Sequence, residues 1–245
     1  MLRDNLTQVH QRIRQTCERV GRDPASVILI AVTKGLPLET IREAVALGVT
    51  EVGENRVQEA GAKIAGWSGG KVRWHLIGHL QRNKAKDAVE LFDAIHSVDS
   101  LALAEELERQ AAKQAEGSRV KGEGTSREAT DVFVQVNVSG EATKFGCSPK
   151  QAAGLAAHVM KQPHLRLAGL MTMAPFSNNP EDARPVFRAL RELRDSLRAA
   201  LHPSPPTIHL SMGMSHDFEV AIEEGADVVR IGTAIFRDQR PETRD

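Results

Sequence analysis

The segment VILIAVTKG (Val27–Gly35) decides which fold the chain can adopt. Its first six residues are apolar without alternation, which is typical of a strand buried on both faces of a parallel sheet. A threonine, a lysine and a glycine then end the apolar run. The segment therefore predicts a buried strand that carries Lys34 at its carboxyl end.

Further strand-like runs follow, and segments with apolar spacing near 3.6 separate them. The predicted strands are Val27–Val32, Glu51–Gly53, Arg73–Ile77, Ala94–Val98, Val132–Val138, Leu165–Met171, Thr207–Ser211 and Val228–Ile231. The predicted helices include residues 1–20, 38–47, 101–112, 150–160 and 183–199. Strands that alternate with helices in this way form parallel βαβ units. We therefore predict a single α/β domain over residues 1–245, folded as a (β/α)8 TIM barrel.

Composition limits the classes of partner. The 32 Lys and Arg residues are balanced by 32 Asp and Glu residues, so a nucleic-acid partner is not expected. No apolar run reaches the roughly 20 residues that cross a membrane, and the amino-terminal segment lacks the apolar core of a signal peptide. We therefore expect a cytoplasmic protein without a membrane partner. The two cysteines are too few for a zinc framework, and no metal site is expected.

One segment departs from the regular alternation of strands and helices. Residues 116–130 (EGSRVKGEGTSREAT) are rich in glycine, serine and charge. This composition predicts a flexible surface loop ahead of the fifth strand.

Binding and catalytic groups of such barrels gather at the carboxyl ends of the strands. There the seventh predicted strand is followed by glycine and serine, and the eighth by Gly232 and Thr233. Small hydroxyl side chains and approachable backbone amides on two neighbouring strands favour a phosphate site, formed here by Ser211, Gly213, Ser215, Gly232 and Thr233. The alternative is that these residues only form tight turns.

Lys34 lies across the predicted mouth from this phosphate site. A lysine directly after a buried strand is expected to have a partly desolvated amine, which favours nucleophilic attack on a carbonyl carbon. Taken alone, Lys34 is better explained as a strand-end lysine whose ammonium group extends into solvent. Together with a phosphate site, it matches the anchoring of pyridoxal 5′-phosphate (PLP), which binds through a lysine Schiff base and its phosphate.

Several motifs also resemble one known family. They are AVTKG, GENRVQE, WHLIGHLQRNK, LAGLMTM, LSMGMSHDFEVAI and VRIGTAIF, and they follow one another in order between Val27 and Phe236. On these motifs the chain is identified as a member of the pyridoxal phosphate homeostasis protein family. The resemblance implies the type III PLP fold, which is the barrel of alanine racemase, here without its carboxyl-terminal β domain.

The resemblance also implies residue roles. Lys34 would hold PLP as a Schiff base, Arg230 would face the pyridine nitrogen, and Asn55 would lie beside the ring. The remaining residues of the implied cofactor site, chiefly around the phosphate, are Ser211, Met212, Gly213, Met214, Ser215, Gly232 and Thr233.

The implied function is a non-catalytic, monomeric PLP-binding protein that influences intracellular PLP supply and amino-acid balance. It would meet PLP-dependent apoenzymes only transiently. Lys144, which follows the fifth predicted strand, is hypothesised to approach the cofactor or to receive it in transit.

Two enzymatic alternatives stay open. A racemase or lyase that acts on a small amino acid needs an acid or base on each face of the cofactor. The chain contains no tyrosine, so a histidine such as His75, His79 or His209 would have to serve. A phosphosugar aldolase would use Lys34 as its Schiff base without PLP.

Overall fold

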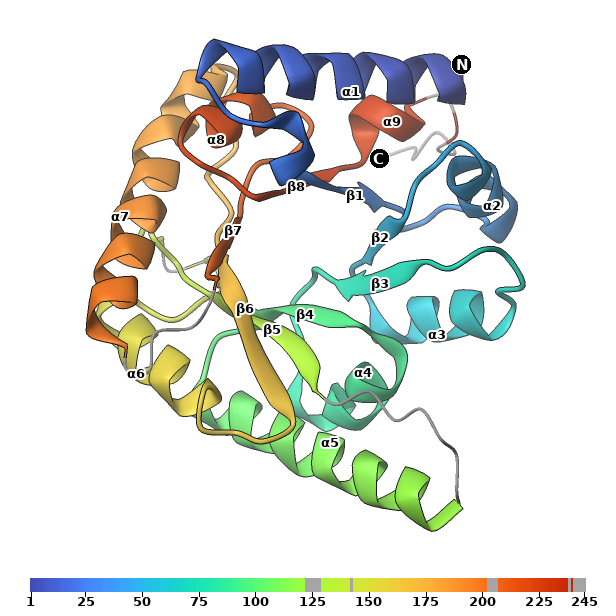
Figure 1. The fold of residues 1–245 in the computed structure, drawn as a ribbon, viewed down its shortest axis with the longest axis vertical. Coiled ribbons are helices and arrows are strands. Elements are labelled where there is room, and N and C mark those ends of the chain that lie inside the picture. Colours follow the sequence, from blue (N-terminus) through green and yellow to red (C-terminus); the bar gives the residue numbers. More distant parts are fainter. Residues whose placement is uncertain (122–128, 142, 202–206, 238, 240–245) are drawn as a thin grey trace.

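The computed structural model describes residues 1–121, 129–141, 143–201, 207–237 and 239. Within them, eight parallel strands pair in sequence order and close into a barrel, which confirms the predicted (β/α)8 fold (Figure 1). The strands are β1 (Ile28–Val32), β2 (Glu51–Glu54), β3 (Arg73–Leu76), β4 (Ala94–Val98), β5 (Thr130–Gln135), β6 (Leu165–Met171), β7 (His209–Ser211) and β8 (Val228–Ile231).

The predicted bounds agree with the structure for three of the eight predicted strands. β4, β6 and β8 have the predicted bounds, and β5 differs most, because it begins two residues and ends three residues earlier than predicted. Its early start includes Asp131, a residue not expected in a buried strand. The carboxylate is tolerated because it pairs with Arg73 of β3 at 2.9 Å and with Arg166 of β6 at 2.5 Å.

Helices surround the barrel on its outer side (Figure 1). They are α1 (Leu2–Arg19), α2 (Leu38–Ala46), α3 (Val57–Ala65), α4 (Ala85–Leu91), α5 (Leu101–Lys121), α6 (Pro149–Val159), α7 (Arg184–Ala200), α8 (Phe218–Glu223) and α9 (Thr233–Phe236). None of the helices in the described part of the chain combines the length and apolar composition that a membrane crossing requires.

The prediction of a loop over residues 116–130 was wrong for the first part of that segment. α5 continues to Lys121, nine residues beyond the predicted helix end, and residues 122–128 lie outside the described residues. Lys113–Lys121 contains one glycine and no proline, so the helical backbone is not interrupted there.

The amino-terminal helix covers the outside of the barrel where the last helices are short. α1 lies across α8 and α9, which are six and four residues long (Figure 1). The amide of Asn5 donates to the carbonyl oxygen of Ile235 at 3.0 Å, and Arg237 donates to the Asn5 side-chain oxygen at 2.8 Å. The two ends of the described chain are therefore joined to each other.

Two apolar cores hold the barrel together. The larger one lies between the strands and the surrounding helices. The smaller one fills part of the barrel interior and consists of Ile30, Ala94, Phe133, Met171 and Val228. The rest of the barrel interior is polar, and this polar part extends to the candidate site.

Candidate functional site

A cavity of 420 Å³ opens at the carboxyl ends of the strands. Its lining includes seven of the ten residues predicted to bind a cofactor: Lys34, Asn55, Met214, Ser215, Arg230, Gly232 and Thr233. They come from the segments that follow β1, β2, β7 and β8, and from β8 itself. The barrel therefore brings together groups that lie up to 199 positions apart in the chain.

Lys34 follows β1 directly and lines this cavity. Its side chain is exposed, so the expectation of a partly desolvated amine was wrong. The reason is that β1 ends before the lysine and the chain turns outward at Gly35, whose φ is 71°. The amine is therefore accessible to a ligand in the cavity.

The residues on both sides of Lys34 are held by one buried cluster. The ammonium group of Lys63 on α3 donates to the carbonyl oxygen of Thr33 at 2.8 Å. It also pairs with Glu54 and Glu59, at 2.7 Å each. Glu59 in turn accepts a hydrogen bond from the backbone N–H of Gly35 at 2.6 Å.

Glu54 is the buried centre of this cluster. Its side chain has no exposed surface, and it accepts from the hydroxyl of Thr33 at 2.6 Å. Burial raises the pKa of Glu54, and the hydrogen bonds from Lys63 and Thr33 oppose that shift. The cluster fixes the backbone of residues 33–35 and leaves the Lys34 side chain free to reach into the cavity.

The turn after β7 requires its glycine. Gly213 has a φ of 91°, and a Cβ atom there would lie 2.5 Å from the Cβ of Ala221 on α8. The next residue is fixed as well, because the N–H of Met214 donates to Asp217 at 2.6 Å. These contacts bring the backbone of the turn to the edge of the cavity.

Ser215 links this turn to the one after β8. Its hydroxyl oxygen accepts hydrogen bonds from the N–H groups of Gly232 and Ala234, at 3.2 Å each. Together with Thr233, the two turns place hydroxyl groups on one side of the cavity. That is the donor set expected for an anion such as a phosphate.

Arg230 forms the cationic floor of the cavity. Its side chain is 3% exposed and donates to the hydroxyl of Ser211 at 2.7 Å and to the carbonyl oxygen of Thr172 at 2.9 Å. Burial lowers the pKa of Arg230 to about 10, against the opposing effect of Asp217. The guanidinium group stays charged near neutral pH and has further N–H groups available for a ligand.

Below Arg230 the polar interior of the barrel continues. The hydroxyl of Ser211 lies 2.9 Å from Nδ1 of His96, and Nε2 of His96 lies 2.9 Å from Nδ1 of His75. Nε2 of His75 lies 2.5 Å from a carboxylate oxygen of Glu51. Burial, followed by the charges of His75 and Arg230, holds the pKa of His96 well below its usual value.

Three predicted site residues do not line the cavity. Ser211 lies beneath Arg230, and Gly213 shapes the turn from behind. Met212 packs in the core between strands and helices with no exposed surface, because its side chain points away from the barrel mouth. Lys144 is also absent from the lining and lies 3.9 Å from Glu141.

The rim of the cavity contains two aromatic side chains, Phe145 and Phe176, that the sequence did not mark. Phe145, Met173, Phe176 and Met214 are exposed, and all four line the cavity. His79 is stacked on Phe145 with ring centroids 3.8 Å apart. These residues come from loops, so only the closed barrel brings them together.

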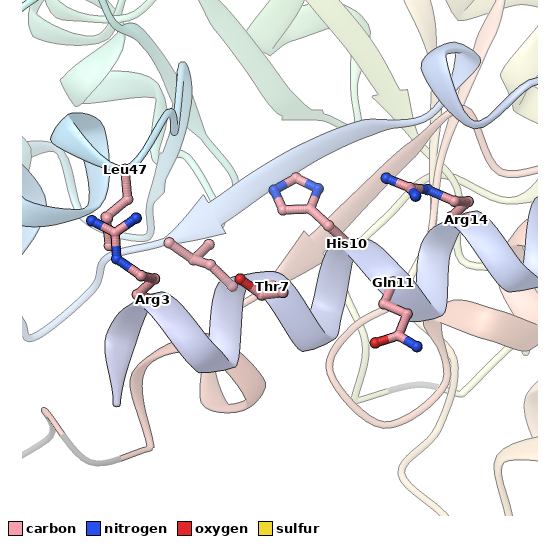
Figure 2. A pocket seen from close by; sticks show the side chains of 7 residues that line it. Arg3, Thr7, His10, Gln11, Arg14 and Leu47 are labelled. Carbon is pink, nitrogen blue, oxygen red and sulfur yellow. The ribbon is translucent and has the colours of Figure 1, made fainter.

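A second hollow, of 370 Å³, lies along α1 beside Leu47, the residue that follows α2 (Figure 2). Figure 2 shows His10 and Arg14 on the side of the helix that faces β1, and Arg3 beside Leu47. His10 and Arg14 also line a cavity of 460 Å³ at the amino ends of β1 and β2. No predicted site residue lies in either hollow.

The fold and the cavity define a class of protein: a (β/α)8 barrel with its ligand site at the carboxyl ends of the strands. Residues 5–240 match the family model for the alanine racemase N-terminal domain. The chain is 43% identical to the pyridoxal phosphate homeostasis protein of Aquifex aeolicus, over 97% of this chain and 98% of the relative. Identity to the protein of that name from Pseudomonas aeruginosa is 42%, over 95% and 94%.

A solved structure agrees with these relatives. PipY of Synechococcus elongatus PCC7942, in a structure with PLP bound, is 34% identical and superposes with a TM-score of 0.80, covering 96% of this chain and all of that one. The chain belongs to the pyridoxal phosphate homeostasis protein family, within the alanine racemase N-terminal domain group.

Proposed function

We propose that this protein binds PLP covalently on Lys34 and takes part in the intracellular supply of the cofactor. The observation that carries the proposal is the cavity in which the Lys34 side chain, the hydroxyl-bearing turns after β7 and β8, and the guanidinium of Arg230 meet. Support comes from PipY, whose structure is described with PLP bound.

The donor set fits each part of the cofactor. Ser215 and Thr233 supply hydroxyls to the phosphate, and Gly213 lets the turn before Ser215 pack against α8. Arg230 directs a donor toward the pyridine nitrogen, which keeps that nitrogen unprotonated. When bound, PLP supplies an aldehyde that reacts with amines.

Asn55 is positioned to contact the flat ring. Gly78 packs so closely against the backbone of Asn55 that a side chain at position 78 would overlap its carbonyl oxygen. Asn55 lines the cavity and follows β2, the strand paired with the β1 strand that precedes Lys34.

The proposed role is that of a cofactor carrier. An arginine at the pyridine nitrogen weakens the ring as an electron sink, so a carbanion is poorly stabilised. The Lys34 side chain is exposed, and this openness suits release of PLP to a recipient apoenzyme. We further propose that the protein is monomeric and cytoplasmic, and its two cysteines are both free.

A second candidate function is a racemase or lyase that acts on a small amino acid. The observation that favours it is His79, which lines the cavity and lies 3.7 Å from Asp99. Such a histidine has the chemistry of a general base. Turnover of amino acids by the loaded protein, lost in His79→Gln, would favour this candidate over the carrier.

The deciding experiment compares wild type, Lys34→Ala and Lys144→Ala after incubation with PLP. We expect visible absorbance in wild type and Lys144→Ala, and none in Lys34→Ala. Borohydride reduction followed by peptide mass mapping should place the adduct on the peptide with Lys34. Equal absorbance in Lys34→Ala would exclude Lys34 as the attachment site.

A further inference from the structure

Five side chains form one continuous hydrogen-bonded chain through the barrel interior. We call it the axial chain, and in order its members are Arg230, Ser211, His96, His75 and Glu51. Its links are 2.7, 2.9, 2.9 and 2.5 Å long. The three middle members are each less than 5% exposed, so water does not compete for these bonds.

The two ends of the axial chain determine its direction. A guanidinium group can only donate, and an ionised carboxylate can only accept. With both imidazoles neutral, Ser211 accepts from Arg230 and donates to Nδ1 of His96. His96 and His75 then both carry their proton on Nε2, so that every bond points from Arg230 toward Glu51.

The ends also open to opposite faces of the molecule. Arg230 lines the PLP cavity, whereas Glu51 lines the cavity at the amino ends of β1 and β2, beside His10 and Arg14. Figure 2 shows these last two side chains on the face of α1 that is turned toward β1. The axial chain thus connects the ligand site with solvent at the far end of the barrel.

Other charges act on the two ends of the axial chain. At one end, the charge of the Asp217 carboxylate opposes the lowering of the Arg230 pKa. Arg73 of β3 lies 3.9 Å from the Glu51 carboxylate, but its closer partner is Asp131, at 2.9 Å. His96 is stacked on Phe133 of β5 with ring centroids 4.1 Å apart, so one of its faces is apolar. The hydrogen-bond partners of Arg230 among the described residues, Ser211 and Thr172, are both neutral.

We propose that Glu51 is the remote counter-charge of Arg230, and that His75 and His96 are positioning residues that transmit its effect. An aligned series of hydrogen bonds polarises each member in turn, so the negative end strengthens the bond at the positive end. The axial chain then fixes the orientation in which Arg230 faces the pyridine nitrogen. This inference rests on the proposed function.

The first test uses the protein without PLP. Nitrogen-15 NMR at about pH 8, above the usual titration range of histidine, distinguishes the two imidazole tautomers. We expect Nε2–H forms of His75 and His96 in wild type, and a mixture of tautomers at both in Glu51→Ala. A wild-type Nδ1–H form at His96, or unchanged tautomers in Glu51→Ala, would overturn the proposal.

The chain offers a matched control. Glu108 and His164 form another carboxylate–imidazole pair, at 2.7 Å, on the outside of the barrel. Glu108→Ala removes a comparable interaction without touching the axial chain. The tautomers of His75 and His96 should be the same in Glu108→Ala as in wild type, and a change there would contradict the proposed specificity.

The second test measures PLP affinity and the visible spectrum. We expect Glu51→Ala and His96→Leu each to bind PLP about tenfold more weakly, with a shifted absorbance maximum. His96→Gln, which can accept and donate in the same order, should restore both. Wild-type affinity and spectrum in Glu51→Ala would overturn the proposal, whereas failure of wild type to bind PLP would overturn the proposed function instead.

Discussion

The ammonium group of Lys63 lies 2.8 Å from the carbonyl oxygen of Thr33, the residue directly before Lys34. A lysine on α3 thus holds the strand end from which Lys34, the proposed attachment site of PLP, projects. The two lysines have different tasks, because Lys63 is 10% exposed and neutralised by carboxylates, whereas Lys34 is exposed.

Replacing Lys63 with methionine should destabilise the fold. The change leaves the fully buried carboxylate of Glu54 without its cation, which typically costs about 3–5 kcal/mol. Urea unfolding would measure the loss. The double variant Lys63→Met with Glu54→Gln should recover most of it, and no recovery would show that the buried charge is not the cause.

Replacing Gly213 with alanine should lower stability and weaken PLP binding. The new Cβ would crowd Ala221, and such overpacking costs about 1–3 kcal/mol in addition to the strain of a positive φ. Gly225→Ala is the matched control, because its φ is 94° but its nearest contact is the flexible Arg191 side chain at 3.5 Å. Equal losses in both variants, seen by thermal unfolding and PLP titration, would refute the crowding.

The carboxylate of Glu224 should make the fold sensitive to acid. It is 4% exposed and lies within 3.1 Å of Arg184, Arg188 and Arg191 of α7. Burial acts to raise the pKa of Glu224, but hydrogen bonds from Arg188 and Arg184, with the nearby arginine charges, outweigh it and lower the pKa.

The direction of the pH effect follows from this lowered pKa. Stabilisation is present above the unfolded-state pKa of about 4.3 and is lost as pH falls through the folded-state value. Glu224→Gln should therefore be less stable than wild type at pH 7, and the difference should shrink on acidification. Urea midpoints over a pH series would measure it, and a constant difference would contradict the assignment.

Neither cysteine should react with alkylating agents in the folded protein. Burial raises the pKa of Cys147 to about 11, and burial also raises the pKa of Cys17. At pH 8 the thiolate fraction of Cys147 is on the order of one in a thousand. Mass spectrometry should show modification only after unfolding in urea, and rapid alkylation of the native protein would contradict the burial.

The order of elements could be predicted because each apolar strand has a local signature. Lys34 and the turns after β7 and β8 could also be placed together from the sequence, since strand ends in a closed barrel all meet at one face. The bounds of β5 were harder to predict, because its Asp131 is stabilised by arginines of β3 and β6. A single sequence does not show such partners.

The rest of the site depends on contacts between distant segments. His96 lies inside an otherwise apolar β4, and its role appears only when β3, β7 and β8 surround it. Phe145 and Phe176 belong to loops with no periodic pattern. The desolvation expected for Lys34 was wrong for a related reason, because the turn at Gly35 sets where the amine lies.

The bond between Asn5 and Ile235 spans 230 positions and has a consequence for how the chain reaches its native state. During synthesis the first helix leaves the ribosome long before its docking surface on α8 and α9 exists. It must wait as an amphipathic helix with an unburied apolar face, which chaperones bind. The barrel closes only when β8 pairs with β1, so a chain that stalls before β8 would leave the barrel open and α1 without its contacts to α9.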